Sequence, residues 1–426
     1  MTSSNQNTDR RDFLQQSVVG AAAGMVIAST TEVVLATNPT QAKELAKPDV
    51  TSSVDVLVVG GGTAGTIAAI QCGRAGAKTL LLERNSQLGG TTTVGGVAFP
   101  GLFDAWGKQV IAGIGWELVK ESVDLDGGKL PNFAKVPQRH FHNQVHVNQF
   151  LYAILAEEKC AKAGVEIAYY EFPQSISKTT DGWQVDCVGF GTHRRVMCKQ
   201  IIDCTGGAEV VGLMGLPRLR EKETMPGSML FKIGSAHNPA ERQLHRLYVH
   251  GADSTNSRTV TLANLTGRKS VLARVRQKKQ RLMHLQPETS FRESYRIVGE
   301  TMITVNDYTS GRKFDDAVCN AFYPVDLHTK TGVRPKPLKP GTVPTIPLGA
   351  LVPKDSRNVI VAGRCLCSDR LANSGLRVQA SCMAMGQAAA VAATLAAKHG
   401  STPHEVPLAE IHNLLRQHNA IVPGKA

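Results

Sequence analysis

The apolar residues near the start of the chain predict a strand, a helix and a second strand. An unbroken apolar run over residues 56–59 is closed by glycine and is too short for a free helix, which favours a buried parallel strand. A helix of small residues is expected over residues 66–75, and a second apolar strand ends at Glu83. This order of elements predicts an α/β fold with a parallel sheet.

The turn between the first strand and the helix predicts a nucleotide site. Gly60, Gly62 and Gly65 stand at the G-x-G-x-x-G spacing. In this motif the first glycine permits a tight turn, the second lets the backbone approach a pyrophosphate, and the third lets helix and strand pack closely. The N–H groups at the start of the helix point at that phosphate. Glu83 follows at the distance where a carboxylate accepts ribose hydroxyls. The stretch predicts an ADP moiety, which both FAD and NAD carry.

Later segments extend the same pattern. Residues 195–203 and 358–362 are predicted as buried strands, each followed closely by glycine, and residues 380–398 as a helix with almost no charge. A helix with so few polar residues must be buried. Its N-terminus can direct the helix dipole at an anionic ring or oxyanion. The glycine pair and hydroxyls of residues 89–93 suit a second loop over phosphate and ribityl groups.

The middle of the chain, from about residue 216 to 349, loses this pattern. Basic helical patches such as residues 268–285 alternate there with a short apolar-polar run at 301–305, and no internal repeat is visible. We expect this part to form a substrate lobe inserted between two parts of the nucleotide-binding domain.

The N-terminus resembles a twin-arginine export signal. The sequence "RRDFL" at Arg10 to Leu14 precedes an apolar run of 11 residues, 18–28, which is too short to span a bilayer comfortably. Asp9 replaces the hydroxyl residue usual before the arginine pair, and a cleavage point is expected after Ala36. The signal predicts the twin-arginine export machinery as a partner, a periplasmic or otherwise exported protein, and no stable membrane span after cleavage. A disordered tail with a chance arginine pair is the alternative.

Composition narrows the classes of function. With 426 residues and 42% hydrophobic content, the chain can bury a large core in two lobes. The net charge of +13 is spread along the chain apart from a patch at residues 274–281, and aromatic residues make up 5%, so no nucleic acid partner is predicted. The nine cysteines show no C-x-x-C pair, and they predict no disulfide framework.

Together these stretches resemble the glutathione-reductase-like FAD flavoproteins, specifically the bacterial FAD-dependent oxidoreductase family, whose members often carry twin-arginine signals. The resemblance runs from residue 54 to 398 in order and is carried by "VVGGGTAGTIAAI", "ERNSQLGGTTTVGGVAFPGLF", "IIDCTGGAEV", "FRESYRIVGE", "FYPVDLH" and "VIVAGRCLCSDRLANSGLRVQASCMAMGQAAAVAA". It implies FAD as the cofactor. It also implies a Rossmann-like FAD/NAD(P)-binding fold of glutathione-reductase type with an inserted α+β substrate lobe.

The resemblance also implies which residues bind FAD. The glycine loop would hold the pyrophosphate, Glu83 the adenosine ribose, the second glycine pair the middle of FAD, and the segment before the apolar helix the isoalloxazine. The full set is Gly60, Gly62, Thr63, Ala64, Gly65, Glu83, Arg84, Gly89, Gly90, Thr91, Thr205, Gly206, Gly363, Arg364, Leu376, Arg377, Val378 and Gln379. Gly207 stands where many relatives place an acid.

The predicted domain boundaries follow from these assignments. They are a signal peptide at 1–36, a linker at 37–53, an FAD-binding domain in two parts at 54–215 and 350–400, the substrate lobe at 216–349, and a C-terminal tail at 401–426.

Two absences narrow the chemistry. Residues 91–102 contain no cysteine pair, which argues against a redox-active disulfide. No second strand, glycine motif and helix follows between residues 206 and 357, so a built-in NAD domain is not expected. Reducing equivalents would come from a substrate in the other lobe, or leave to an unknown electron acceptor.

The candidate catalysts lie in the segment "YPVDLH". Alternation along an extended chain puts Asp326 and His328 on one face, and an imidazole beside a carboxylate can take a proton. A purely structural loop is an equal alternative. Arg377 is a candidate to stabilise a substrate anion or reduced-flavin charge.

Two further groups of polar residues are not assigned to catalysis. His140, His142 and His146 have the spacing of metal ligands, but no carboxylate or cysteine completes the set, so no metal is predicted. The stretch from Arg292 to Arg296 is expected to be a buried ion-pair brace.

These observations favour an FAD-dependent dehydrogenase or oxidase that transfers a hydride between a small organic substrate and flavin. The basic middle lobe favours an anionic substrate. Three alternatives remain: an NAD-dependent dehydrogenase, an exported flavoprotein that passes electrons to a protein partner, and a flavin enzyme whose net reaction is not redox.

The N-terminal pattern generates a test of export. A reporter protein fused to residues 1–36 should reach the periplasm, and replacing both Arg10 and Arg11 with lysine should stop it. The replacement keeps the positive charge, so an ordinary secretory signal would still export the reporter. Measuring the reporter in periplasmic fractions of cells carrying each fusion separates the two signals.

Overall fold

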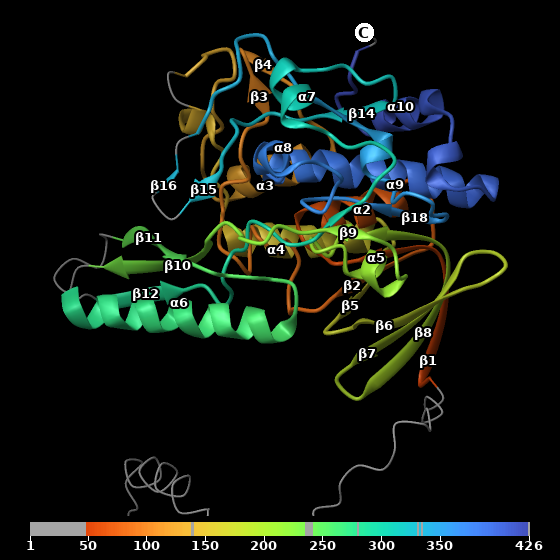
Figure 1. The fold of residues 1–426 in the computed structure, drawn as a ribbon, viewed down its shortest axis with the longest axis horizontal. Coiled ribbons are helices and arrows are strands. Elements are labelled where there is room, and N and C mark those ends of the chain that lie inside the picture. The colour runs from red at the N-terminus through yellow and green to blue at the C-terminus, as the bar shows by residue number, and fades with distance from the viewer. Residues whose placement is uncertain are drawn as a thin grey trace, which may run out of the picture. The chain divides into compact units, whose positions relative to one another are not determined.

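The computed structural model describes residues 48–137, 140–234, 242–278, 281–329, 332–333 and 335–424. The predicted signal peptide at 1–36 lies outside these residues. From Pro48 onward the chain forms one compact unit, built around a seven-stranded sheet (Figure 1). The strand order is β5-β2-β1-β8-β7-β6, with β18 paired to β8. The strands are β1 (Val50–Val59), β2 (Thr79–Glu83), β5 (Glu166–Tyr169), β6 (Phe172–Lys178), β7 (Trp183–Gly189), β8 (Thr192–Asp203) and β18 (Val359–Val361).

The core of this sheet is parallel, as the sequence predicts. β1 runs parallel to β2 and β8, and β5 and β18 extend the parallel part on either side, while β6 and β7 add an antiparallel hairpin. Residues 80–82 of β2 are fully buried, which is typical of a strand covered on both faces. In the paired register Val59 and Val361 both lie beside Asp203. The carboxyl ends of β1, β8 and β18 therefore meet at one edge of the sheet.

Two helices that pack on this sheet approach each other at unusually short range. α2 (Thr63–Arg74) and α9 (Gln379–His399) cross each other, and α9 also contacts β1, β8 and β18 (Figure 1). A Cβ atom on Gly386 of α9 would stand 2.2 Å from the backbone oxygen of Ala64, so only glycine permits the crossing. Among the described residues α9 is the one helix long and apolar enough to cross a membrane, but 89% of its apolar window is buried inside the unit.

Smaller elements surround this core. They are β3 (Asp104–Ala105), β4 (Lys108–Gln109), α3 (Ile114–Leu125), α4 (Gln149–Lys162), α5 (Glu209–Leu213), β9 (Arg218–Leu219), β13 (Arg296–Ile297), α7 (Val305–Ser310), β14 (Ala317–Asn320), β15 (His328–Thr329), β16 (Gly332–Val333), β17 (Thr345–Pro347), α8 (Arg370–Leu376) and α10 (Leu408–Gln417).

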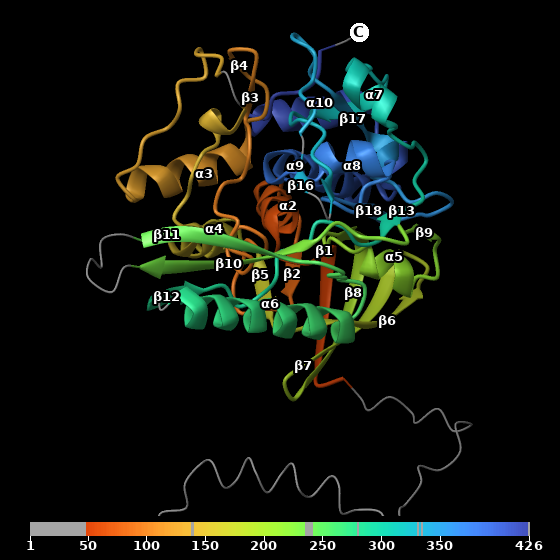
Figure 2. The same ribbon diagram turned by 60° about the vertical axis from the view of Figure 1, so that its left-hand side comes forward.

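A second sheet lies within the segment expected to be the substrate lobe. β10 (Gly227–Gly234) runs antiparallel between β11 (Arg242–Val249) and β12 (Arg281–Leu285), and α6 (Ser257–Lys278) lies along one face of this sheet (Figure 2). Met229 and Phe231 of β10 pack with Val271 of α6 in a separate small core. Alternate residues of β10 therefore face away from α6.

Two element boundaries differ from the sequence expectations. The prediction of a helical patch through Leu285 is wrong beyond Lys278, because residues 281–285 form β12, in which Leu282 pairs with Ile233 of β10. β1 begins at Val50, inside the stretch expected to be linker, because its first residues pair with β8 from Arg194 onward. The other domain boundaries stay predictions.

The crossing of α2 and α9 generates a test of stability. Gly386→Ala should destabilise the protein by about 2 kcal/mol or more, because the added methyl group meets backbone that cannot rotate away. This cost outweighs the roughly 1 kcal/mol that alanine gains over glycine inside a helix. Urea unfolding measures the change. Gly424→Ala is the matched control, because a Cβ there would meet no atom within 4 Å, and an equal loss in both variants would contradict the packing argument.

Candidate functional site

A cavity of about 1630 Å³ joins the carboxyl edge of the parallel sheet to the second sheet. At the end near the parallel sheet it is lined by the glycine turn after β1 and by residues that follow β8 and β18. At the end near the second sheet it is lined by Ser228 and Leu230 of β10. Ligand pockets commonly measure about 300–1,000 Å³. This cavity is therefore large enough for an extended cofactor together with a second molecule.

The glycine turn is shaped for the close approach of a ligand. Gly60 has φ +97°, and a Cβ there would stand 2.7 Å from the backbone oxygen of Cys204; at Gly65 it would stand 1.8 Å from the oxygen of Gly60. Gly62 is different. It lines the cavity, and a Cβ there would meet no protein atom within 4 Å. Gly60 and Gly65 thus serve the packing of the chain, whereas Gly62 leaves open space of the kind a pyrophosphate needs.

Glu83 holds this turn in place. The residue is 5% exposed and lines the cavity. One oxygen accepts the N–H of Gly61 at 2.7 Å, and the other accepts the N–H of Asn85 at 2.8 Å. Burial raises the pKa of Glu83 above its usual value. Since each carboxylate oxygen has two lone pairs, both remain able to accept a ribose hydroxyl.

The second glycine loop packs directly on the first. Gly89 donates its N–H to the oxygen of Gly61 at 2.8 Å, and a Cβ on Gly90 would stand 2.9 Å from the Cα atom of Gly62. Gly90 and Thr91 line the cavity, as do Thr63 and Ala64. Gly65 and Gly89 lie behind this surface, outside the cavity lining.

The loops after β8 and β18 are joined by Arg364. Its Nε donates to the oxygen of Gly206 at 2.7 Å and its Nη1 to the oxygen of Phe291 at 3.0 Å; burial lowers its pKa. The hydroxyl of Thr205 donates to Asp203 at 2.7 Å and accepts the N–H of Glu209 at 3.0 Å. Thr205, Gly206, Gly363 and Arg364 all line the cavity. Arg84 lies at the same end, with its guanidinium 3.5 Å from Glu209 and 3.6 Å from Glu288.

The start of α9 also faces the cavity. Arg377, Val378 and Gln379 line it, whereas Leu376 is fully buried outside the lining. Val378 at the N-cap has no polar side chain to satisfy the first N–H groups of this 21-residue helix. Gln379 is fixed by the oxygen of Val97, to which it donates at 2.8 Å, and by the hydroxyl of Thr92. The positive end of the helix dipole is therefore available to an anionic group.

A hydrogen-bonded triad, Tyr248, His328 and Asp326, stands at the other end. His328 Nε2 lies 3.0 Å from Asp326 Oδ2, and His328 Nδ1 lies 2.8 Å from the hydroxyl of Tyr248. An ionised carboxylate only accepts hydrogen bonds, so Nε2 carries the hydrogen and Nδ1 accepts the hydroxyl of Tyr248. His328 is 6% exposed. Burial lowers its pKa below the usual value, although the hydrogen bond to Asp326 acts in the opposite direction.

Three arginines line the cavity around this triad. Arg377 Nη2 lies 3.6 Å from Asp326 Oδ2, and the guanidinium groups of Arg246 and Arg292 lie 5.0 Å and 5.5 Å from the centre of the Tyr248 ring. The strand register explains this grouping, because Arg246 and Tyr248 of β11 pair with Leu230 and Ser228 of β10. Arg246, Leu230 and Ser228 line the cavity, and Tyr248 lies outside its lining.

The sequence analysis missed Tyr248 and Arg246. Their spacing of two residues places both side chains on one face of a strand. The sequence around them carries no motif, however, and only the pairing with β10 shows that this face borders the cavity.

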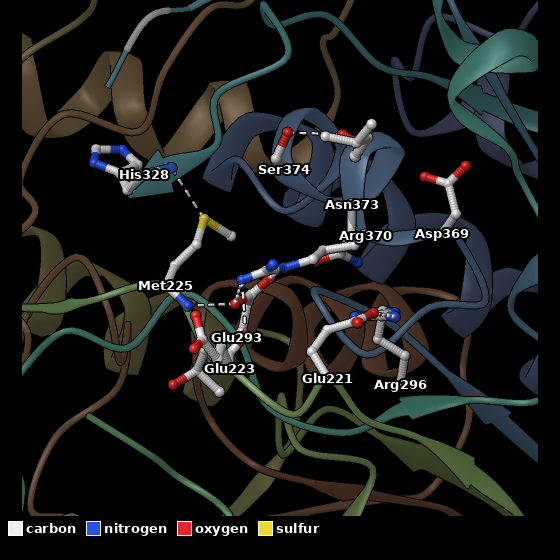
Figure 3. Close-up of polar contacts among 12 residues, drawn as sticks. Glu221, Glu223, Met225, Glu293, Arg296, His328, Asp369, Arg370, Asn373 and Ser374 are labelled. Atoms are coloured by element: carbon white, nitrogen blue, oxygen red, sulfur yellow. Dashed lines mark hydrogen bonds and ion pairs between the residues drawn. The ribbon is translucent and has the colours of Figure 1, made fainter. Parts of the chain in front are cut away.

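The expected ion-pair brace exists, but with different partners. Glu293 pairs with Arg370 at 2.6 Å and Arg296 pairs with Glu221 at 2.7 Å (Figure 3). Glu293 also accepts the N–H of Met225, whose sulfur accepts the backbone N–H of His328.

Arg292 was expected to belong to the brace and lines the cavity instead. It donates to the oxygen of Pro226 at 2.5 Å and to the hydroxyl of Ser228 at 3.0 Å. The brace and the triad are thus connected through Met225, whereas Arg292 belongs to the cavity wall.

Other candidates from the sequence lie elsewhere. Within the described parts of the chain, no three His, Cys, Asp or Glu side chains gather as metal ligands, and the side chain of His140 lies outside these parts. All nine cysteines fall within the described residues and are buried and unpaired. Cys382 lines the cavity.

This combination of fold and site defines a class of protein. A parallel sheet with a glycine turn after β1, an acid at the end of β2 and a large cavity at the carboxyl edge is a Rossmann-type dinucleotide-binding fold. The chain belongs to the FAD dependent oxidoreductase family, which it matches over residues 55–266 and 265–415. FAD is therefore the cofactor, and the predicted fold class and family are confirmed.

Individual relatives match shorter stretches. Over 91 residues the chain is 43% identical to a pseudooxynicotine dehydrogenase of a Pseudomonas species and 40% identical to a nicotine dehydrogenase of Pseudomonas putida. These matches cover 21% of this chain and 18% of each relative. Among solved structures, the anhydrotetracycline hydroxylase of Streptomyces rimosus is 14% identical with a TM-score of 0.47, covering 86% of this chain and 66% of that one.

The glycine turn generates a test of cofactor binding. Gly62→Val should fold normally but lose FAD, because its side chain meets only the space of the cavity. Gly60→Ala is the comparison variant, because its Cβ meets Cys204 in a backbone conformation that favours glycine, so it should destabilise the protein even without FAD. The ratio of flavin to protein absorbance and the unfolding of the FAD-free proteins measure the two effects. Full retention of FAD by Gly62→Val would contradict this placement of the cofactor.

Proposed function

We propose that the protein oxidises a small organic molecule at the end of the cavity that holds the Tyr248–His328–Asp326 triad. The observation that carries this proposal is that a buried, neutral histidine and the glycine turn for the cofactor line one continuous cavity. When bound, FAD supplies a two-electron acceptor for a hydride.

Three parts of the chain would hold the cofactor. The turn containing Gly62 and the loop containing Gly90 give backbone access for the pyrophosphate, and Glu83 accepts ribose hydroxyls. The N-terminus of α9 directs its dipole at the cavity and would stabilise negative charge there. Residues at the N-terminal ends of α2 and α9 thus orient the cofactor before a substrate arrives.

The triad would accept the proton that the substrate loses. Burial alone would raise the pKa of Asp326, but the hydrogen bond from His328 and the charge of Arg377 lower it, so this carboxyl is ionised at neutral pH. His328 lines the cavity and Tyr248 stands outside its lining, so the substrate proton would pass to Nδ1 of His328, the atom whose ring Tyr248 orients through its hydroxyl. Asp326 then stabilises the imidazolium that forms.

Electron disposal and export complete the proposal. The electrons would leave to an acceptor of unknown identity, and the arginine pair at Arg10 and Arg11 supports export of the folded, FAD-loaded protein to the periplasm.

The second candidate is a flavoprotein that exchanges electrons only with a protein partner. The surface-exposed basic helix α6 favours this candidate, because an acidic redox partner would complement its charge.

Anaerobic bleaching of the flavin tests the reaction. Small organic compounds are screened for one that removes the flavin absorbance, and His328→Ala should then slow bleaching by about 10²- to 10⁴-fold with FAD still bound. Tyr248→Phe should slow it too, and the wild-type rate should fall as the pH drops through the lowered pKa of His328, because protonated His328 cannot accept a proton. His404→Ala is the control, since His404 is exposed and lies outside the cavity.

Two results would count against the proposal. An unchanged rate in His328→Ala removes this histidine as the proton acceptor. Bleaching by a redox protein but by no small molecule would favour the electron-carrier candidate.

A further inference from the structure

We propose that Arg246, Arg292 and Arg377, which we call the arginine cluster, form a subsite for the carboxylate of an organic acid substrate. The proposal rests on the proposed function, since it assigns a chemical class to the molecule that the Tyr248–His328–Asp326 triad would deprotonate. The three side chains come from β11, from the segment after β12 and from the C-terminus of α8, and all three line the cavity.

The charges at this end of the cavity do not balance. Among the described residues of the cavity lining, Asp326 is the one carboxylate near the arginine cluster, and it is already hydrogen-bonded to His328. The other acids of the lining are engaged elsewhere: Glu83 with Gly61, Asp104 with Asn143, Glu171 with Arg194, and Glu209 and Glu288 with Arg84. Three guanidinium groups thus face one carboxylate and a neutral histidine, which leaves an excess of positive charge.

Arg292 shows this excess most directly. Its hydrogen bonds go to two uncharged groups, the oxygen of Pro226 and the hydroxyl of Ser228. Burial, followed by the neighbouring charge of Arg377, lowers its pKa to about 9, so it remains charged at neutral pH. A partly buried cation without a paired anion is unfavourable, and an anionic ligand would reduce that cost.

Arg377 carries an unused donor in the same place. Its Nε is buried and finds no hydrogen-bond partner among the residues described, and its side chain is 14% exposed. Its Nη2 donates to the backbone oxygen of Asp326 at 3.3 Å. A buried N–H left unpaired is unfavourable, so the protein satisfies the guanidinium group of Arg377 only in part. Arg246, in contrast, is exposed and would attract an anion from the mouth of the cavity.

The cluster is separate from the groups that would hold the cofactor's phosphates. Gly62 and Gly90 stand at the carboxyl edge of the parallel sheet, whereas Arg246 projects from the second sheet. Guanidinium groups recognise a carboxylate through paired N–H donors. A carboxylate held there would place the remainder of the molecule beside His328, which contacts both Tyr248 and Asp326.

Equilibrium binding to the FAD-loaded protein tests the proposal. The probes are acids and their matched amides, benzoate with benzamide and pyruvate with pyruvamide, together with phenyl phosphate; titration calorimetry and the shift of the flavin spectrum report binding. Each acid should bind at least about tenfold more tightly than its amide. Arg292→Gln and Arg377→Gln should abolish that preference. Arg246 is exposed, so Arg246→Gln does not put folding at risk. This variant should weaken the preference for acids and make the binding of acids less dependent on salt concentration.

Arg276→Gln is the matched control, because Arg276 is exposed on α6 and lies outside the cavity. The proposal is overturned if amides bind as tightly as acids, if phenyl phosphate is preferred to both acids, if no acid binds saturably, or if the three cavity variants behave like Arg276→Gln. Its failure is distinguishable from that of the proposed function. Bleaching by neutral compounds alone would overturn the carboxylate subsite and leave the oxidation intact, whereas arginine-dependent binding of acids without any bleaching would support the subsite and contradict the oxidation.

Discussion

The structure depends on the close approach of backbone segments around the glycine turn after β1. Gly60 lies against Cys204 at the end of β8, Gly65 lies against Gly60, and Gly386 of α9 lies against Ala64 of α2. No side chain fits at these contacts, so strand, turn and both helices are held at fixed distances. The carboxyl edge of the parallel sheet is consequently rigid. At the glycine turn the cavity wall on the cofactor side is backbone, which cannot swing away as side chains can.

A second set of contacts joins this rigid part to the residues that would perform the chemistry. Glu293 links Arg370 at the start of α8 to Met225, and Met225 in turn contacts the backbone of His328. Arg364 connects the loop after β8 to Phe291, the residue before Arg292. The triad and Arg292 are therefore positioned by buried polar contacts that lead back to the parallel sheet. Such contacts are weak evidence for stability, but they fix where the two ends of the cavity stand with respect to each other.

The electrostatics of the cavity differ between its ends. Near the glycine turn, Arg84 is balanced by Glu209 and Glu288, and Glu83 is satisfied by backbone N–H groups. Near the triad, positive charge exceeds negative charge, and burial keeps His328 neutral. This arrangement favours both proton acceptance and anion binding. A neutral histidine has a basic nitrogen, and guanidinium groups without a paired carboxylate attract an anion.

The amino-acid sequence by itself determined the nucleotide-binding half of the protein. The period of the apolar residues, the spacing of Gly60, Gly62 and Gly65, and the position of Glu83 are local features, and they suffice because one βαβ unit contains the glycine turn, the helix N-terminus and the acid. The sequence also placed Asp326 next to His328, since two residues in an extended segment share a face. Only the tertiary structure brought Tyr248 and Arg246 to His328, separated Arg292 from its neighbours Glu293 and Arg296, and turned residues 281–285 into a strand. These outcomes depend on the pairing of β10 with its neighbours and on which face α6 covers, and such long-range contacts leave no fixed spacing in the sequence.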